Sequence, residues 1–186
     1  MSEVDAFLRR VIALLNTAKI PYMVVGSFAS GIHGHFRSTH DLDIVIDANS
    51  GQLQDFVRFA AADFYADAHA ANEALARRSM FNIIDFSSGY KADLIFRKLR
   101  KFSESEFGRK QIARLVEMDI WLASAEDTIL SKLEWAKLGQ SERQYQDAFH
   151  IATMKGAELD SAYLRRWAVE LDVADLLEKL LTEASL

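Results

Sequence analysis

The sequence predicts an α/β (α+β) fold, in which a small mixed, twisted sheet with flanking helices is followed by a C-terminal helical bundle. Short apolar stretches bounded by turn residues occur up to residue 123 and indicate strands, whereas residues 124–186 repeat apolar side chains at helical spacing. The chain has one proline and no glycine- or serine-rich linker. We therefore expect a sheet domain at residues 1–123, with a helical subdomain at residues 124–186 packed on it.

The first part of the chain alternates between helical and strand patterns. An amphipathic helix over residues 3–18 is expected to end at Pro21, because proline lacks the backbone donor that a continuing helix needs. The other expected elements are a strand at 22–26, a short helix from Ser27, a strand at 42–46, helices at 51–61 and 70–78, a hairpin of strands at 81–86 and 91–96, and a strand pair at 112–116 and 120–123, of which the first could also be a helix.

Four helices are expected after residue 123, and capping residues mark their starts. Ser124 and Ser141 are each followed three residues later by an acid or amide, which is the pattern of a capping box. Asp160 and Asp172 are expected to cap the third and fourth helices, and Gly156 to end the second.

Two predicted strands carry aspartates where a buried strand normally has apolar residues. Asp41 and Asp43 are two residues apart, so both project from one face of a strand, and Asp93 lies on the second strand of the expected hairpin. Like charges this close repel each other, and a hard cation with oxygen ligands relieves the repulsion. These residues predict a site for Mg²⁺ or Mn²⁺. The alternative is structural, with Asp93 paired to a lysine such as Lys91.

A glycine follows the apolar strand that begins at Tyr22. Gly26 allows a ligand to approach the backbone closely, and Ser27 begins a short helical pattern. The free N–H groups and the positive dipole end of such a helix favour an anion such as a phosphate. The alternative is an ordinary turn and helix cap.

Together, Gly26-Ser27, Asp41-Leu42-Asp43 and Asp93 resemble the motifs of the nucleotidyltransferase superfamily of polymerase beta type. The run from Arg37 to Asp43 is similar to the minimal bacterial members, including the AbiEii-like toxins of abortive-infection systems. The resemblance implies a sheet of nucleotidyltransferase type. It also implies a magnesium-dependent enzyme that moves a nucleoside monophosphate from an NTP, such as ATP, to a hydroxyl group.

The resemblance also implies roles for individual residues. Asp41 and Asp43 would ligate the metals, and Asp93 would bind the metal that activates the attacking hydroxyl and help to accept its proton. Ser27 and the backbone after Gly26 would hold the β and γ phosphates. Further residues of the nucleotide site would be Arg37, Thr39 and Lys132, although Arg37 could instead form a salt bridge and Lys132 could be an exposed lysine.

The C-terminal half matches the toxin pattern only in part. These toxins carry a lysine and an Arg…Lys-Asp…Asp pattern, which Lys132, Arg143 and Asp147 match, whereas Gln146 and His150 stand where the family has lysine and aspartate. Arg143 and Asp147, four residues apart on one helix, also fit a surface ion pair.

The sequence leaves three classes of molecule as carriers of the acceptor hydroxyl. An RNA end would use a strip of basic residues between Arg97 and Arg114, a small molecule would need only a compact polar cleft, and a protein hydroxyl is a third option. A cognate antitoxin or another partner protein fits the resemblance to the toxins. The alternative to an enzyme is a catalytically silent module that binds a nucleotide or a partner.

Composition restricts the class of protein. The net charge of −5 argues against broad non-specific binding of nucleic acid, and the absence of cysteine excludes disulfides and thiolate metal sites. The five histidines lack partners at zinc-site spacing. The N-terminus has no signal-peptide pattern, and no apolar run reaches the roughly 18 residues of a membrane span. We therefore expect a soluble cytoplasmic protein.

Overall fold

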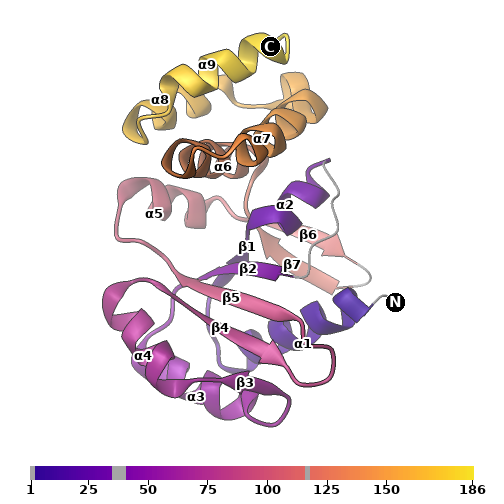
Figure 1. Ribbon diagram of the computed structural model, residues 1–186, viewed down its shortest axis with the longest axis vertical. Coiled ribbons are helices and arrows are strands. Elements are labelled where there is room, and N and C mark those ends of the chain that lie inside the picture. Colours follow the sequence, from indigo (N-terminus) through magenta and orange to yellow (C-terminus); the bar gives the residue numbers. More distant parts are fainter. Residues whose placement is uncertain (1–2, 35–40, 116–117) are drawn as a thin grey trace. The chain divides into compact units, whose positions relative to one another are not determined.

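The computed structural model describes residues 3–34, 41–115 and 118–186, and these divide by their contacts into two compact units (Figure 1). The first unit comprises residues 3–24, 41–99, 111–115 and 118–122, and the second comprises residues 25–34, 100–110 and 123–186. A mixed sheet occupies the first unit and helices make up the second. The predicted fold class is therefore confirmed.

In the described residues the sheet has seven strands in the order β3-β4-β5-β2-β1-β7-β6. The β2–β5 and β1–β7 pairs are parallel and the other pairs are antiparallel, so the sheet is mixed as expected. The strands are β1 (Tyr22–Val24), β2 (Asp41–Ile46), β3 (Phe64–Ala66), β4 (Met80–Asp85), β5 (Lys91–Phe96), β6 (Gln111–Leu115) and β7 (Met118–Leu122).

The helices of the first unit are α1 (Glu3–Thr17), α3 (Ser50–Ala60) and α4 (Ala68–Arg77). One apolar face of α1 is fully buried, as its amphipathic pattern predicts. Asn49 and Gln52 form a reciprocal capping box at the start of α3. Phenylalanines from helices and strands fill the core of this unit, with Phe7, Phe56, Phe64 and Phe96 among its largest fully buried side chains.

The second unit contains α2 (Gly26–Ile32), α5 (Lys101–Gly108), α6 (Ala125–Gly139), α7 (Glu142–Lys155), a 3-10 turn (Gly156–Glu158), α8 (Ser161–Glu170) and α9 (Ala174–Glu183). The four helices expected after residue 123 are confirmed. Figure 1 shows α8 and α9 stacked as a layer against α6 and α7. The short helix α2 packs on α6 and α7, and the His33 ring nitrogen Nε2 lies 2.7 Å from the Ala123 carbonyl oxygen. The domain boundary expected between residues 123 and 124 stays a prediction.

Three of the four predicted N-cap residues occupy the N-cap position, two of them with the expected hydrogen bond, and the fourth prediction is wrong. Ser124 and Asp160 accept hydrogen bonds from the backbone N–H groups of Asp127 and Tyr163, whereas Ser141 at the start of α7 makes no such bond. The N-cap position of α9 is taken by Val173 and not by Asp172. Asp172 has a left-handed backbone conformation, with φ of 57°, and lies one residue further from the helix. Asp172 instead contacts Lys137, so a tertiary contact replaces the local cap.

No helix among the described residues has the length and the apolar character that crossing a bilayer requires.

Candidate functional site

The three aspartates lie on neighbouring parallel strands near the middle of the sheet. Asp43 of β2 pairs in register with Asp93 of β5, and Asp41 pairs with Lys91. Residues opposite each other on adjacent strands point to the same face, and so do residues two apart on one strand. The carboxylates of Asp41, Asp43 and Asp93 therefore share one face of the sheet, although about fifty residues separate β2 from β5 along the chain.

A lysine lies among these carboxylates. The Lys91 ammonium nitrogen Nζ is 3.0 Å from Oδ2 of Asp93 and 3.7 Å from Oδ1 of Asp41. The hydrogen bond to Asp93 is the main cause that raises the pKa of Lys91, and the charges of Asp93, Asp41 and Asp43 add to it, so the amine stays protonated. From the sequence, Lys91 is expected only as a structural partner of Asp93 in place of a metal site.

The two oxygens of Asp93 have different environments. The side chain is only 10% exposed, and its Oδ2 atom accepts the hydrogen bond from Lys91. Its Oδ1 atom is buried and has no hydrogen-bond partner among the described residues. A buried carboxylate oxygen without a partner carries a desolvation cost that a cation would remove. The orphaned oxygen therefore fits the predicted role of Asp93 as a metal ligand.

No ready-made metal cage exists in the part of the chain that the structure describes. No three acidic or histidine side chains in this part are close enough together to hold a metal ion by themselves. Asp41 lies at the solvent edge, with its side chain 59% exposed. Mg²⁺ commonly uses one or two carboxylates and takes its other ligands from water and substrate phosphates. The carboxylates present suit that mode of binding better than an all-protein site.

Gly26 and Ser27 open helix α2, directly after strand β1 in the chain. Gly26 has a φ of +66°, which favours glycine because a side chain would clash there. Val25 precedes the helix and gives no side-chain cap. Strand β1 ends at Val24, two residues before the end of the expected strand at 22–26. The change from strand to helix comes at Gly26, where the sequence predicts it. The other two phosphate-site candidates, Arg37 and Thr39, lie outside the described residues.

Lys132 is buried between α6 and α7, so the alternative of an exposed lysine is wrong. Its ammonium nitrogen lies 2.7 Å from Oδ2 of Asp147, and both side chains are about 5% exposed. Asp147 thus uses a lysine of another helix as its ion-pair partner. From the sequence, Asp147 is expected to pair with Arg143, because helix spacing reveals neighbours only on the same helix.

The arginines of the basic strip form ion pairs within their own units. Four of its side chains take part in ion pairs: Arg97 with Asp47, Arg100 with Glu134, Arg109 with Glu126 and Asp127, and Arg114 with Asp119. Paired guanidinium groups have little charge left for a polyanion. The structure therefore weakens the case for RNA as the acceptor.

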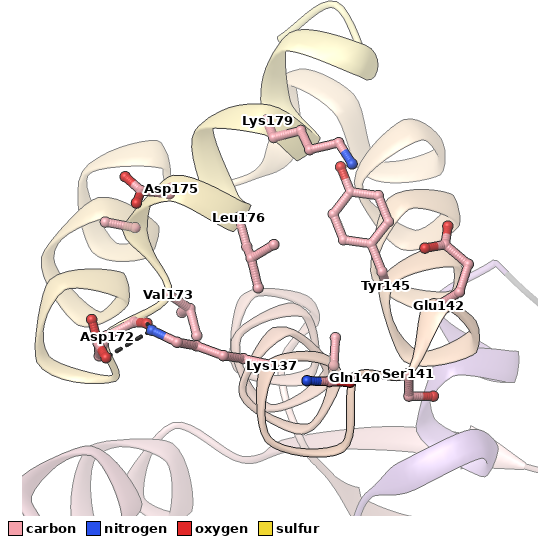
Figure 2. A pocket seen from close by; sticks show the side chains of 12 residues that line it. Lys137, Gln140, Ser141, Glu142, Tyr145, Asp172, Val173, Asp175, Leu176 and Lys179 are labelled. Carbon is pink, nitrogen blue, oxygen red and sulfur yellow. Dashed lines mark hydrogen bonds and ion pairs between the residues drawn. The ribbon is translucent and has the colours of Figure 1, made fainter.

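A pocket of about 570 Å³ lies within the helical unit, between the end of α6, the start of α7, the α8–α9 connection and α9 (Figure 2). Lys137 pairs with Asp172 at 2.7 Å, and the Lys179 ammonium lies over the Tyr145 ring, 4.8 Å from its centroid. Two of the polar contacts in this pocket are thus made between lining residues. Its lining includes none of the candidate site residues.

The fold is similar to that of two solved structures, one of them an adenylyltransferase. The crystal structure of ANT(2'')-Ia in complex with adenylyl-2''-tobramycin aligns with 91% of this chain and 98% of its own, with a TM-score of 0.59 and 11% identity. The lincomycin-bound lincosamide antibiotic adenylyltransferase LnuA aligns with 83% of this chain and 98% of its own, with a TM-score of 0.54 and 14% identity. No family model and no curated sequence matches the chain. The likeness is therefore one of fold, and the AbiEii-like subgroup stays a prediction.

Proposed function

We propose that the protein is a metal-dependent nucleotidyltransferase, which moves a nucleoside monophosphate from an NTP to an acceptor hydroxyl. The observation that carries this proposal is the register of Asp43 and Asp93 on neighbouring parallel strands, with Asp41 on the same face. The buried, unpartnered Oδ1 atom of Asp93 adds a second reason to expect a cation there. The fold shared with two adenylyl-transferring enzymes supports the same reaction class.

In this mechanism Asp41 and Asp43 would hold the metal. When bound, Mg²⁺ or Mn²⁺ would supply positive charge to the triphosphate and lower the pKa of the attacking hydroxyl. Asp93 would offer Oδ1 to the cation or to the hydroxyl proton while Lys91 holds Oδ2. Phosphoryl chemistry needs little more than this positioning and charge neutralisation.

The other nucleotide-site residues are proposed from the resemblance. Gly26 and Ser27 would bind the β and γ phosphates through backbone N–H groups and a hydroxyl, with Arg37 and Thr39 beside them in sequence. Lys132 would reach a nucleotide only by leaving Asp147, so we propose that its first role is to join α6 to α7.

For the acceptor we propose a small-molecule hydroxyl in preference to an RNA end. The ion pairs of the basic strip and the net charge of −5 disfavour a polyanion. The two structures compared above contain tobramycin in adenylylated form and lincomycin, both small molecules. A toxin role with a cognate antitoxin has only the sequence resemblance in its support.

The first prediction concerns Asp43. Purified protein incubated with Mg²⁺, each labelled NTP and a panel of small polyhydroxylated acceptors, including tobramycin and lincomycin, should transfer label to an acceptor. Asp43→Asn removes a metal-ligand charge on which the reaction depends, so the rate should fall by at least about a hundredfold. Chromatography of the labelled products measures the transfer.

Asp55→Asn is the matched control, because Asp55 is an exposed aspartate of α3 in the same unit. It should transfer label at the wild-type rate. Transfer by Asp43→Asn at the wild-type rate would show that the metal site is wrong. Tight NTP binding with no pyrophosphate released for any acceptor would favour the catalytically silent module.

A further inference from the structure

The carboxylate face of β2 and β5 already contains one positive charge. Asp41, Asp43 and Asp93 contribute three negative charges, and the Lys91 ammonium lies 3.0 Å from Asp93 and 3.7 Å from Asp41. Lys91 stands opposite Asp41 in the parallel register and two residues before Asp93 on the same strand. Strand geometry therefore directs its side chain to the face on which the aspartates lie.

A cation in this position affects a second cation in two ways. It keeps one oxygen of Asp93 engaged, so only Oδ1 is available to a metal. It also repels a divalent ion a few ångströms away, and partial burial limits the screening by water, since the Lys91 side chain is 35% exposed and that of Asp93 10%. The cluster has a net charge of −2 and no three-residue metal cage exists among the described residues, so we expect the protein groups alone to hold a metal weakly.

We propose that Lys91 is a resident counter-ion that lowers the affinity of the carboxylates for free divalent metal, so that the metal binds together with the nucleotide. A triphosphate brings several negative charges and its own oxygen ligands, which offset the repulsion from the ammonium. Lys91 is thus a positioning residue for Asp93 and a determinant of the order of binding. This inference rests on the proposed function, because it takes the aspartates as metal ligands.

Binding of Mn²⁺ without nucleotide tests this inference, measured by electron paramagnetic resonance of the free ion. Lys91→Met and Lys91→Gln remove the charge, and the glutamine keeps a donor for Asp93. Each should bind Mn²⁺ about tenfold more tightly than the wild type, the order expected when one unit charge beside a dication is removed. Lys91→Arg keeps the charge and should bind as the wild type does. Lys98→Met, an exposed lysine beyond the end of β5, is the matched control and should also leave binding unchanged.

Thermal unfolding gives a readout that does not depend on catalysis. Without metal, Lys91→Met should unfold at a lower temperature than the wild type, because the aspartates then repel each other without a counter-ion. Mn²⁺ should raise its unfolding temperature by more than that of the wild type. In the presence of a non-hydrolysable ATP analogue, the difference in Mn²⁺ affinity between the two proteins should shrink.

The outcomes separate the two proposals. If the wild type binds Mn²⁺ with the analogue and Asp43→Asn does not, but both charge-removing variants bind free Mn²⁺ no more tightly than the wild type, the role of Lys91 is overturned and the metal site stands. If neither the wild type nor any Lys91 variant binds Mn²⁺, with or without the analogue, the metal site and the proposed function both fail.

Discussion

Two buried carboxyl groups take opposite charge states because their hydrogen-bond partners differ. Asp85 is 1% exposed, and burial alone would raise its pKa, but hydrogen bonds from Ser88 and Ser87 and the charge of Arg10 outweigh burial and lower it. Glu106 of α5 receives one hydrogen bond, from the Ser131 hydroxyl. Burial is therefore the dominant cause at Glu106, nearby Asp127 adds to it, and the pKa rises to about 8.

We predict that the stability of the folded protein depends on pH through Glu106. Below pH 4.5 this carboxyl is protonated in the folded and unfolded states, and between 4.5 and about 8 only the unfolded state loses the proton. Its contribution to stability is therefore present below pH 4.5 and is lost as the pH rises through about 8, at up to about 1.4 kcal/mol per pH unit. Glu106→Gln removes the ionisable group, so it should be more stable relative to the wild type at pH 8 than at pH 5, by an amount on the order of a few kcal/mol.

Urea unfolding at the two pH values measures this difference. Glu104→Gln, an exposed glutamate of the same helix, should change stability equally at both pH values. A Glu106→Gln effect that is the same at pH 5 and pH 8 would contradict the assignment of a protonated buried carboxyl.

At the scale of elements, a buried ion pair joins α6 and α7. Lys132 and Asp147 are 2.7 Å apart and almost fully buried, in a layer whose other members are apolar side chains such as Leu133 and Ile151. Two charges removed from water cost more than their attraction returns unless they stay paired. The pair therefore specifies how α6 faces α7, while the surrounding apolar contacts supply most of the stability.

This arrangement predicts a non-additive pair of substitutions. Lys132→Met and Asp147→Leu should each destabilise the protein by roughly 3–5 kcal/mol, because each leaves an unpaired buried charge. The double variant should lose much less than the sum of the two. Chemical denaturation of the four proteins gives the coupling energy.

Lys137→Met is the matched control for the Lys132 variant. It lies on the same helix and pairs with Asp172, but its side chain is 47% exposed and that of Asp172 92%. The loss should be below about 1 kcal/mol. Equal losses at the buried and exposed pairs would show that burial does not set the strength of these contacts.

At the scale of the whole molecule, charge limits the partners. The chain has a net charge of −5, and arginines of its basic segment form ion pairs within their own units. Affinity for RNA comes mainly from the release of counter-ions by unpaired lysine and arginine side chains. An acidic protein whose arginines are paired can gain little affinity for RNA from counter-ion release.

We therefore expect no saturable binding to single-stranded RNA tighter than about 10⁻⁴ M at physiological salt. Fluorescence anisotropy of a labelled oligonucleotide, with and without Mg²⁺ and an NTP analogue, measures this affinity. Micromolar binding that weakens steeply with salt would contradict the expectation and favour an RNA acceptor.

Most elements of the fold could be predicted because their signals are local. The hairpin of β4 and β5 and the four helices from α6 onward follow from the periodicity of adjacent residues and from turn and cap residues. Strand β3 was missed because three residues are too few to show alternation. Helix α5 was missed because its sequence continues the basic segment and was interpreted only by its charge. Ser141 takes the predicted N-cap position of α7 without a side-chain hydrogen bond, and the Asp172 cap failed because Asp172 makes a tertiary contact with Lys137.

Most strands and helices, and the aspartates on two of the strands, could be recognised from the amino-acid sequence because their signals come from residues close together in the chain. The folded chain was needed to show that Asp43 lies in register with Asp93, that Lys91 lies between Asp93 and Asp41, and that Lys132 is buried against Asp147. Register and burial depend on pairing between distant segments. A shift of one residue in β5 would turn Asp93 to the other face, so its place beside Asp43 depends on how the two strands pair.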